Sequence, residues 1–162
     1  MESRAKLLGH PIHQMLVVFP LGLLGMAVIF DVLALVLGNG YWSEIALWMM
    51  ASGLVTALIA APFGTIDWLA IPSGTRAKRI GALHGGGNLL VVALFAGSLW
   101  LRWNTPAAPS TLALALGFIA FVLAMATGWL GGELVDRLAV GVDEGAHLDA
   151  PSSLKTRRIV RS

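Results

Sequence analysis

The sequence predicts an all-α integral membrane protein, built as a bundle of four transmembrane helices. Of its 162 residues, 57% are hydrophobic and 12% are charged, a composition too apolar for a water-soluble domain of this length. Four apolar stretches each approach the ~20 residues that cross the hydrocarbon core of a bilayer. They lack the alternation of β-strands, and backbone groups in lipid must be paired within their own segment, so each stretch is predicted to be a helix.

Residues 1–142 form the predicted domain, and the polar residues 143–162 form a flexible tail. The four spans cover about residues 14–37, 45–63, 82–101 and 112–130. Pro20 lies inside the first span and is expected to kink that helix or leave a carbonyl free. The second and fourth spans carry small residues at four-residue spacing, which permits close helix packing: Gly53, Ala57 and Ala61, then Ala120, Ala124 and Gly128.

Basic residues predict which side of the membrane each end faces. Arg4 and Lys6 precede the first span, and three basic residues lie between the second and third spans. Arg137 and the basic residues of the tail follow the fourth span, whereas Arg102 is the only basic residue on the opposite side. Under the positive-inside rule, both termini are predicted to be cytoplasmic.

Composition also excludes several functions. No cysteine is present, so disulfides, Cys-based zinc sites, iron–sulfur clusters and covalently attached haem cannot form within the chain. The net charge of +2 is small and sits in loops and the tail, which indicates membrane orientation and no nucleic-acid partner. No nucleophile has a base and an orienting group at its depth, so the chain is not expected to be an enzyme by itself.

The two halves of the chain show a weak internal repeat. His13 and His84 each stand shortly before a Leu-Val-Val run, near the start of the first and third spans. Asp67 closes the second span and Glu133 the fourth, each near a tryptophan. Two helical hairpins related by an axis along the membrane normal would produce this pattern, and chance similarity between apolar helices is the alternative.

Ionisable residues are expensive within a membrane, and most of those near the spans gather at one end of the predicted bundle. The predicted metal ligands are His10, His13, His84, Asp67 and Glu133. Asn88, one turn after His84, is expected to orient that ring, so His13, His84 and Asn88 form the predicted cofactor site. Two opposed histidines at one depth suit haem b, whereas three histidines with carboxylates suit a divalent transition metal.

Ordinary structural roles compete with these predictions. Basic loop residues could supply the cations for Asp67 and Glu133. His10 could cap the helix, and His13 could extend to the membrane interface. The three glycines at 85–87 could serve helix packing or admit a flat cofactor.

Several motifs are similar to those of a known family. They are Gly9-His10-Pro11-Ile12-His13 with Phe19-Pro20-Leu21-Gly22, Gly64-Thr65-Ile66-Asp67-Trp68, His84 with Asn88, and Gly128-Trp129-Leu130-Gly131-Gly132-Glu133-Leu134-Val135 followed by Gly141-Val142. On these residues the chain resembles the bacterial membrane proteins grouped as domain of unknown function 2231, over about residues 9–142. The resemblance implies a four-helix domain of the bacterial inner membrane. Gln14 departs from the usual His-Pro continuation, which leaves the start of the helix less rigidly set.

Relatives fused to Rieske-type or c-type cytochrome domains imply proximity to electron transfer. The leading hypothesis is therefore a small membrane redox or metal protein in which His13 and His84 bind haem b or a metal ion. A metal-ion or proton carrier is second, with Asp31 at the opposite end of the path, and a cofactor-free assembly or scaffold subunit is third. The expected partners are the lipid bilayer, a separate redox protein and a second copy of the chain in a homo-oligomer.

Overall fold

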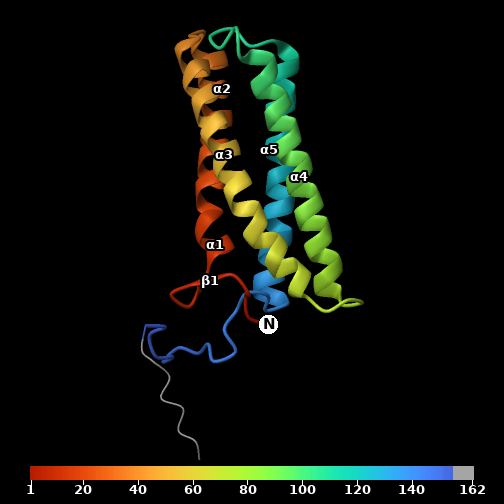
Figure 1. Cartoon of the computed structure of the whole chain (residues 1–162). Helices are drawn as coiled ribbons and strands as arrows, with labels where there is room; N and C mark the ends of the chain where they lie inside the picture. The colour runs from red at the N-terminus through yellow and green to blue at the C-terminus, as the bar shows by residue number, and fades with distance from the viewer. Residues whose placement is uncertain (155–162) are drawn as a thin grey trace, which may run out of the picture.

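The computed structural model describes residues 1–154, which form four long helices that lie side by side (Figure 1). The first is divided into α1 (Ile12–Leu16) and α2 (Val18–Leu37). The others are α3 (Tyr41–Ala70), α4 (Arg76–Arg102) and α5 (Thr111–Gly132), the last continued by the π-helical turn η1 (Glu133–Arg137). All four are long and apolar enough to cross a membrane, so the chain is a multi-pass membrane protein with four candidate spans.

The four helices pack as two adjacent pairs. Most contacts of α2 are with α3 and most contacts of α4 are with α5, whereas α3 touches α4 and α2 touches α5 less extensively. The predicted four-helix bundle of two hairpins is therefore confirmed. Its centre is apolar and draws on every long helix through Leu24, Ala27, Val28, Met50, Leu54, Val91, Phe95 and Ala120.

Local chemistry explains where the helices begin and break. The carbonyl of Leu16 would normally accept a bond from the N–H of residue 20, but Pro20 has none, and the helix is interrupted at Val17. The side chain of Thr75 accepts a hydrogen bond from the backbone of Lys78 and caps the start of α4. Ser110 caps α5 in the same way.

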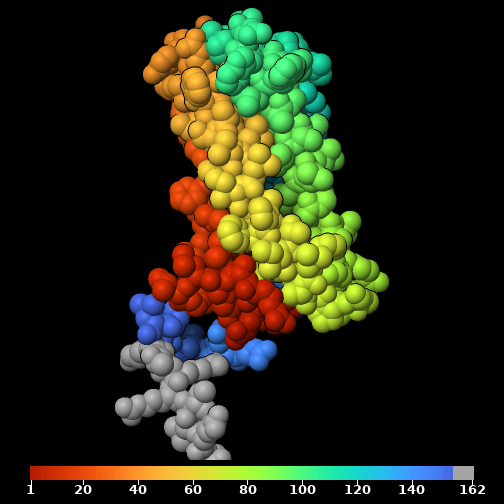
Figure 2. Space-filling model, viewed as in Figure 1, coloured from red at the N-terminus to blue at the C-terminus, as the bar shows by residue number. Residues whose placement is uncertain are grey.

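The N-terminal residues fold across one end of the bundle, next to the residues that follow α5 (Figure 2). A short hairpin of β1 (Lys6–Leu7) and β2 (His10–Pro11) leads directly into α1. The N-terminal ammonium of Met1 donates to the carbonyl of Ala139 at 2.9 Å, and the N–H of Gly141 donates to the carbonyl of Met1 at 2.8 Å. We call residues 1–11 and 138–144 the terminal cap.

The predicted flexible tail begins at residue 143, within the terminal cap, and continues beyond it. From residue 143 to residue 154 the chain forms turns and irregular segments at the capped end of the bundle. The rest of the predicted tail, with its basic residues Lys155, Arg157, Arg158 and Arg161, lies outside the described residues.

Candidate histidine site

His13 lies on α1 and packs its ring against α3. Its Nδ1 lies 3.0 Å from the carbonyl oxygen of Ala60, which can only accept, so Nδ1 carries the proton. The ring occupies the space beside Gly64, where a Cβ would come within 2.7 Å of the His13 Cε1. Glycine at position 64 therefore makes room for the imidazole.

His84 repeats this arrangement between α4 and α5. Its Nδ1 donates to the carbonyl of Thr127 at 2.8 Å, and its ring lies beside Gly131, where a Cβ would approach its Cε1 to 3.0 Å. In both hairpins, the glycine follows the residue whose carbonyl accepts from the imidazole by four residues, about one helical turn.

The side-chain amide of Asn88 lies against the face of the His84 ring. Its Nδ2 lies 3.2 Å from Nε2 and 3.5 Å from Nδ1 of that ring. A position so nearly equidistant from both nitrogens lies over the ring face, because in the ring plane it would collide with Cε1 between them. Thr127 donates from its hydroxyl to Oδ1 of Asn88 at 3.0 Å. Asn88 therefore contacts both His84, one turn earlier on α4, and Thr127 of α5.

In both rings the second nitrogen, Nε2, is unprotonated. With Nδ1 protonated, Nε2 keeps its in-plane lone pair, the form in which imidazole binds metals. Within residues 1–154, no in-plane hydrogen-bond partner occupies Nε2 of His13 or His84.

Asp67 is directed to the N-terminal segment instead of to the histidines. Its carboxylate accepts from the hydroxyl of Ser3 at 2.7 and 2.8 Å, from the N–H of Arg4 at 2.7 Å and from the N–H of Ala5 at 3.3 Å. These donors offset the unfavourable position of a carboxylate near a helix C-terminus. Asp67 thus holds the terminal cap to α3.

Glu133 and His10 also have partners away from the two rings. Arg76 pairs with Glu133 at 2.5 Å, which joins the start of α4 to η1. His10 is exposed on β2 and lies 3.3 Å from the hydroxyl of Ser153. It does not cap the helix, since Pro11 occupies the N-cap position of α1.

The predicted ligands lie at one end of the bundle, but they are not gathered into one cluster within the described residues. Within residues 1–154, no group of three or more His, Asp or Glu side chains is placed to hold a metal ion. His10, Asp67 and Glu133 lie at the same end of the bundle as His13 and His84, but backbone donors and Arg76 engage the two carboxylates. His13 and His84 are the two predicted ligands whose Nδ1 is bonded to a backbone carbonyl, and we call these two residues the His13/His84 pair.

The three glycines after His84 have two different environments. A Cβ at Gly87 would come within 2.5 Å of Cγ2 of Thr127, so this glycine allows α4 and α5 to approach closely. Gly85 and Gly86 have no atoms within 4 Å of a Cβ position and lie on the exposed side of α4. Packing thus accounts for the third glycine, whereas the first two face away from the other helices.

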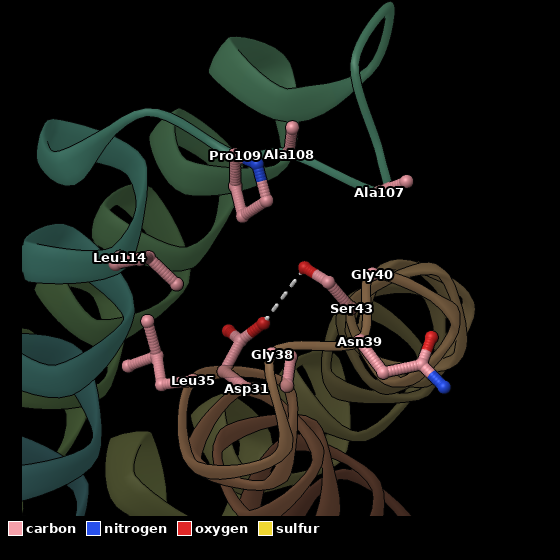
Figure 3. A pocket seen from close by; sticks show the side chains of 11 residues that line it. Asp31, Leu35, Gly38, Asn39, Gly40, Ser43, Ala107, Ala108, Pro109 and Leu114 are labelled. Atoms are coloured by element: carbon pink, nitrogen blue, oxygen red, sulfur yellow. Dashed lines mark hydrogen bonds between the residues drawn. The ribbon is translucent and has the colours of Figure 1, made fainter.

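At the opposite end of the bundle, a buried network joins all four helices. Arg102 of α4 makes a bidentate ion pair with Asp31 of α2, at 2.8 and 2.9 Å. Ser43 of α3 donates to Asp31 at 3.3 Å, beside a pocket of about 220 Å³ (Figure 3). Ser98 accepts from Arg102 and donates to the α5 carbonyl of Ala113 at 2.6 Å. The side chains of Arg102 and Asp31 are 0% and 3% exposed, so this is an ion pair out of contact with water.

Sequence reasoning missed several partners in these two sites. The carbonyls of Ala60 and Thr127 carry no side-chain signal, although Gly64 and Gly131 one turn later lie in the motifs quoted above. The pairing of Arg102 with Asp31 could have been suspected. Among residues 1–154, Arg102 is the only basic residue toward that end of the bundle, and Asp31 and Glu44 are the only acidic ones.

Comparison with known proteins identifies the family. A family model described as predicted membrane protein (DUF2231) matches residues 9–144, which include both histidines and the glycines that they contact. No curated protein and no solved structure matches the chain. The match covers most of the sequence, and the chain therefore belongs to the DUF2231 family of predicted membrane proteins.

Proposed function

We propose that this protein is a small membrane redox protein that binds one haem b through Nε2 of His13 and Nε2 of His84. The observation that carries the proposal is the matched geometry of the two rings. Each donates Nδ1–H to a backbone carbonyl, rests on a glycine and keeps its Nε2 lone pair free. A hydrogen bond from Nδ1 to a carbonyl is the common way in which proteins orient a histidine toward iron or another metal.

The number of ligands favours haem over a bare ion. A porphyrin supplies four nitrogen ligands, so two histidines complete the coordination of its iron. A structural zinc ion needs four ligands and a catalytic one needs three from the protein. Within the described residues only two histidines share the required orientation, since Asp67 and Glu133 are engaged elsewhere.

Asn88 and Thr127 contact the ring of His84 and hold it in place. A bound haem would supply one-electron transfer. The chain's own part would be to set the direction of both imidazoles and to exclude water from their inner side.

The apolar centre of the bundle argues against the carrier hypothesis. The apolar core lies between the Asp31–Arg102 network and the level of the His13/His84 pair. In α4, for example, Val91 and Phe95 separate Ser98 from His84. A path for protons or metal ions would have to cross this layer without polar steps.

We further propose that the capped end faces the cytoplasm of a bacterium, with a separate redox protein as electron partner. Exposed Arg4, Arg76, Arg79 and Arg137 lie at this end. At the opposite end Arg102 is the one basic side chain among the described residues. The positive-inside rule therefore supports a cytoplasmic position for the capped end.

Absorption spectroscopy tests the proposal. Protein expressed with an ample haem supply and purified in detergent should show a Soret band and bis-histidine α and β bands after reduction. His13→Ala and His84→Ala should each remove most of the bound haem. His10→Ala and His147→Ala are matched controls, because both residues are exposed, and should retain it.

A different outcome would favour another function. Should the purified protein contain neither haem nor stoichiometric metal under these conditions, the proposal is wrong. The histidines would then act as helix-locking groups in an assembly subunit.

A further inference from the structure

We infer that the hairpin of β1 and β2 places its tip, Leu7 and Leu8, in the interfacial layer of the same bilayer that holds the helices. This inference does not depend on haem binding. The two leucines are 53% and 69% exposed, at an end of the bundle that also carries exposed charged side chains such as Arg4. Apolar side chains at this level gain free energy by entering the boundary between headgroups and acyl chains.

The hairpin is held rigidly enough to act as an anchor. Lys6 pairs with Pro11 and Leu7 with His10, and the N–H of Ile12 donates to the carbonyl of Ala5 at 2.9 Å. Asp67 fixes the preceding residues to α3 through backbone N–H groups. The direction of the tip is therefore set by the bundle.

The turn of the hairpin is conformationally strained, because a leucine occupies a position that favours glycine or asparagine. Leu8 has a φ of 52° and Gly9 a φ of 89°, so a bulky side chain occupies a left-handed conformation that asparagine or glycine adopts more easily. If Leu8 were exposed to water, no favourable interaction would offset the free-energy cost of this strain. Contact of the Leu8 side chain with lipid would offset it.

The surface next to the tip is already lipid-facing. Pro11 ends the hairpin and caps α1, and the next exposed apolar side chains are Met15, Val18 and Phe19. The hairpin projects sideways at the foot of α1, away from the other helices (Figure 1). Its leucines thus continue the lipid-facing surface of α1 and α2, and exposed Arg4 is available to anionic headgroups.

Site-specific fluorescence tests the inference. The chain has no cysteine, so a single introduced cysteine carries an NBD label at one position. Leu8→Cys is the test and Leu7→Cys an independent second variant. Val18→Cys, on the lipid-facing surface, is the lipid standard, and Leu148→Cys is the aqueous standard, since Leu148 is equally apolar and fully exposed in the tail.

Labelled proteins in nanodiscs of phosphatidylcholine and phosphatidylglycerol are quenched with 5-doxyl lipid or with iodide. Quenching by the doxyl lipid should be at least about twofold stronger at residue 8 than at residue 148, and quenching by iodide weaker. If residues 7 and 8 instead follow residue 148 with both quenchers while residue 18 responds to the doxyl lipid, the tip lies in water and the inference is overturned.

Discussion

At the scale of single residues, the protein depends on glycines that make space for rings. Gly64 and Gly131 each leave room for one imidazole, and Gly87 leaves room for the side chain of Thr127. Glycine weakens a helix by about 1 kcal/mol relative to alanine. Its presence at these positions is explained by the rings and side chains that approach the backbone there.

Gly64→Ala should displace the ring of His13, because the new Cβ would lie 2.7 Å from its Cε1. Overpacking of this kind costs about 1–3 kcal/mol, which exceeds the gain in helix propensity. Gly128→Ala is the matched control, since nothing lies within 4 Å of its Cβ position. Thermal unfolding in detergent should show a lowered midpoint for the first variant only, and equal midpoints would contradict the assigned ring position.

The bond between Thr127 and Asn88 should be measurable as a coupling energy. Interhelical hydrogen bonds in membranes contribute about 0.6 kcal/mol on average and up to about 1.7 kcal/mol. A double-mutant cycle of Thr127→Val and Asn88→Ala, followed by equilibrium unfolding in mixed micelles, should give a value in this range. Additive effects would mean that the two side chains do not interact.

At the scale of the elements, the terminal cap shows how one carboxylate organises a segment without helix. Asp67 accepts three donors from residues 3–5, and Lys6 bonds to Glu2 within the same segment. The hydrogen bond from Lys6 holds the pKa of Glu2 below its ordinary value. Asp67 joins the N-terminal part of the cap to α3, whereas the Lys6–Glu2 pair lies within the cap, half-buried and partly screened by water.

Asp67→Asn should release this segment, because an amide presents one acceptor where the carboxylate presents two. Amide hydrogen exchange at Arg4 and Ala5 should accelerate, and trypsin should cut more readily after Arg4 and Lys6. Asp136→Asn provides the control, as this carboxylate is exposed and lies in η1. Unchanged exchange at Arg4 in the Asp67 variant would show that other contacts hold the cap.

At the scale of the whole molecule, the Asp31–Arg102 pair joins helices of different hairpins. Asp31 lies on α2 and Arg102 on α4, and serines add α3 and α5 to the network. Both charges are buried, so the pair stabilises the bundle only while both partners are present. It also favours the observed arrangement of the two hairpins over others.

Arg102→Met alone should be strongly destabilising, by about 3–5 kcal/mol, because it leaves the carboxylate of Asp31 buried without a counter-ion. Asp31→Leu combined with Arg102→Met should recover most of that loss. Unfolding of the single and double variants in mixed micelles measures the difference. A double variant as unstable as the single one would indicate that the ion pair does more than neutralise its own charges.

The sequence was sufficient to predict four spans, their helical state and the end at which the titratable side chains gather. These properties depend on the length and polarity of each stretch, because lipid accepts only self-paired backbone of a fixed length. The interruption near Pro20 and the contact of Asn88 with His84 are local, so spacing along one helix was enough to anticipate them.

Contacts between helices were beyond this reasoning. Asp31 and Arg102 are 71 residues apart, and their meeting depends on how each helix is rotated about its axis and which helices are neighbours. The same rotation turns Asp67 toward the N-terminal segment and Glu133 toward Arg76. Polarity along a chain sets the depth of a side chain in the membrane, whereas packing of neighbouring helices decides which groups meet at that depth.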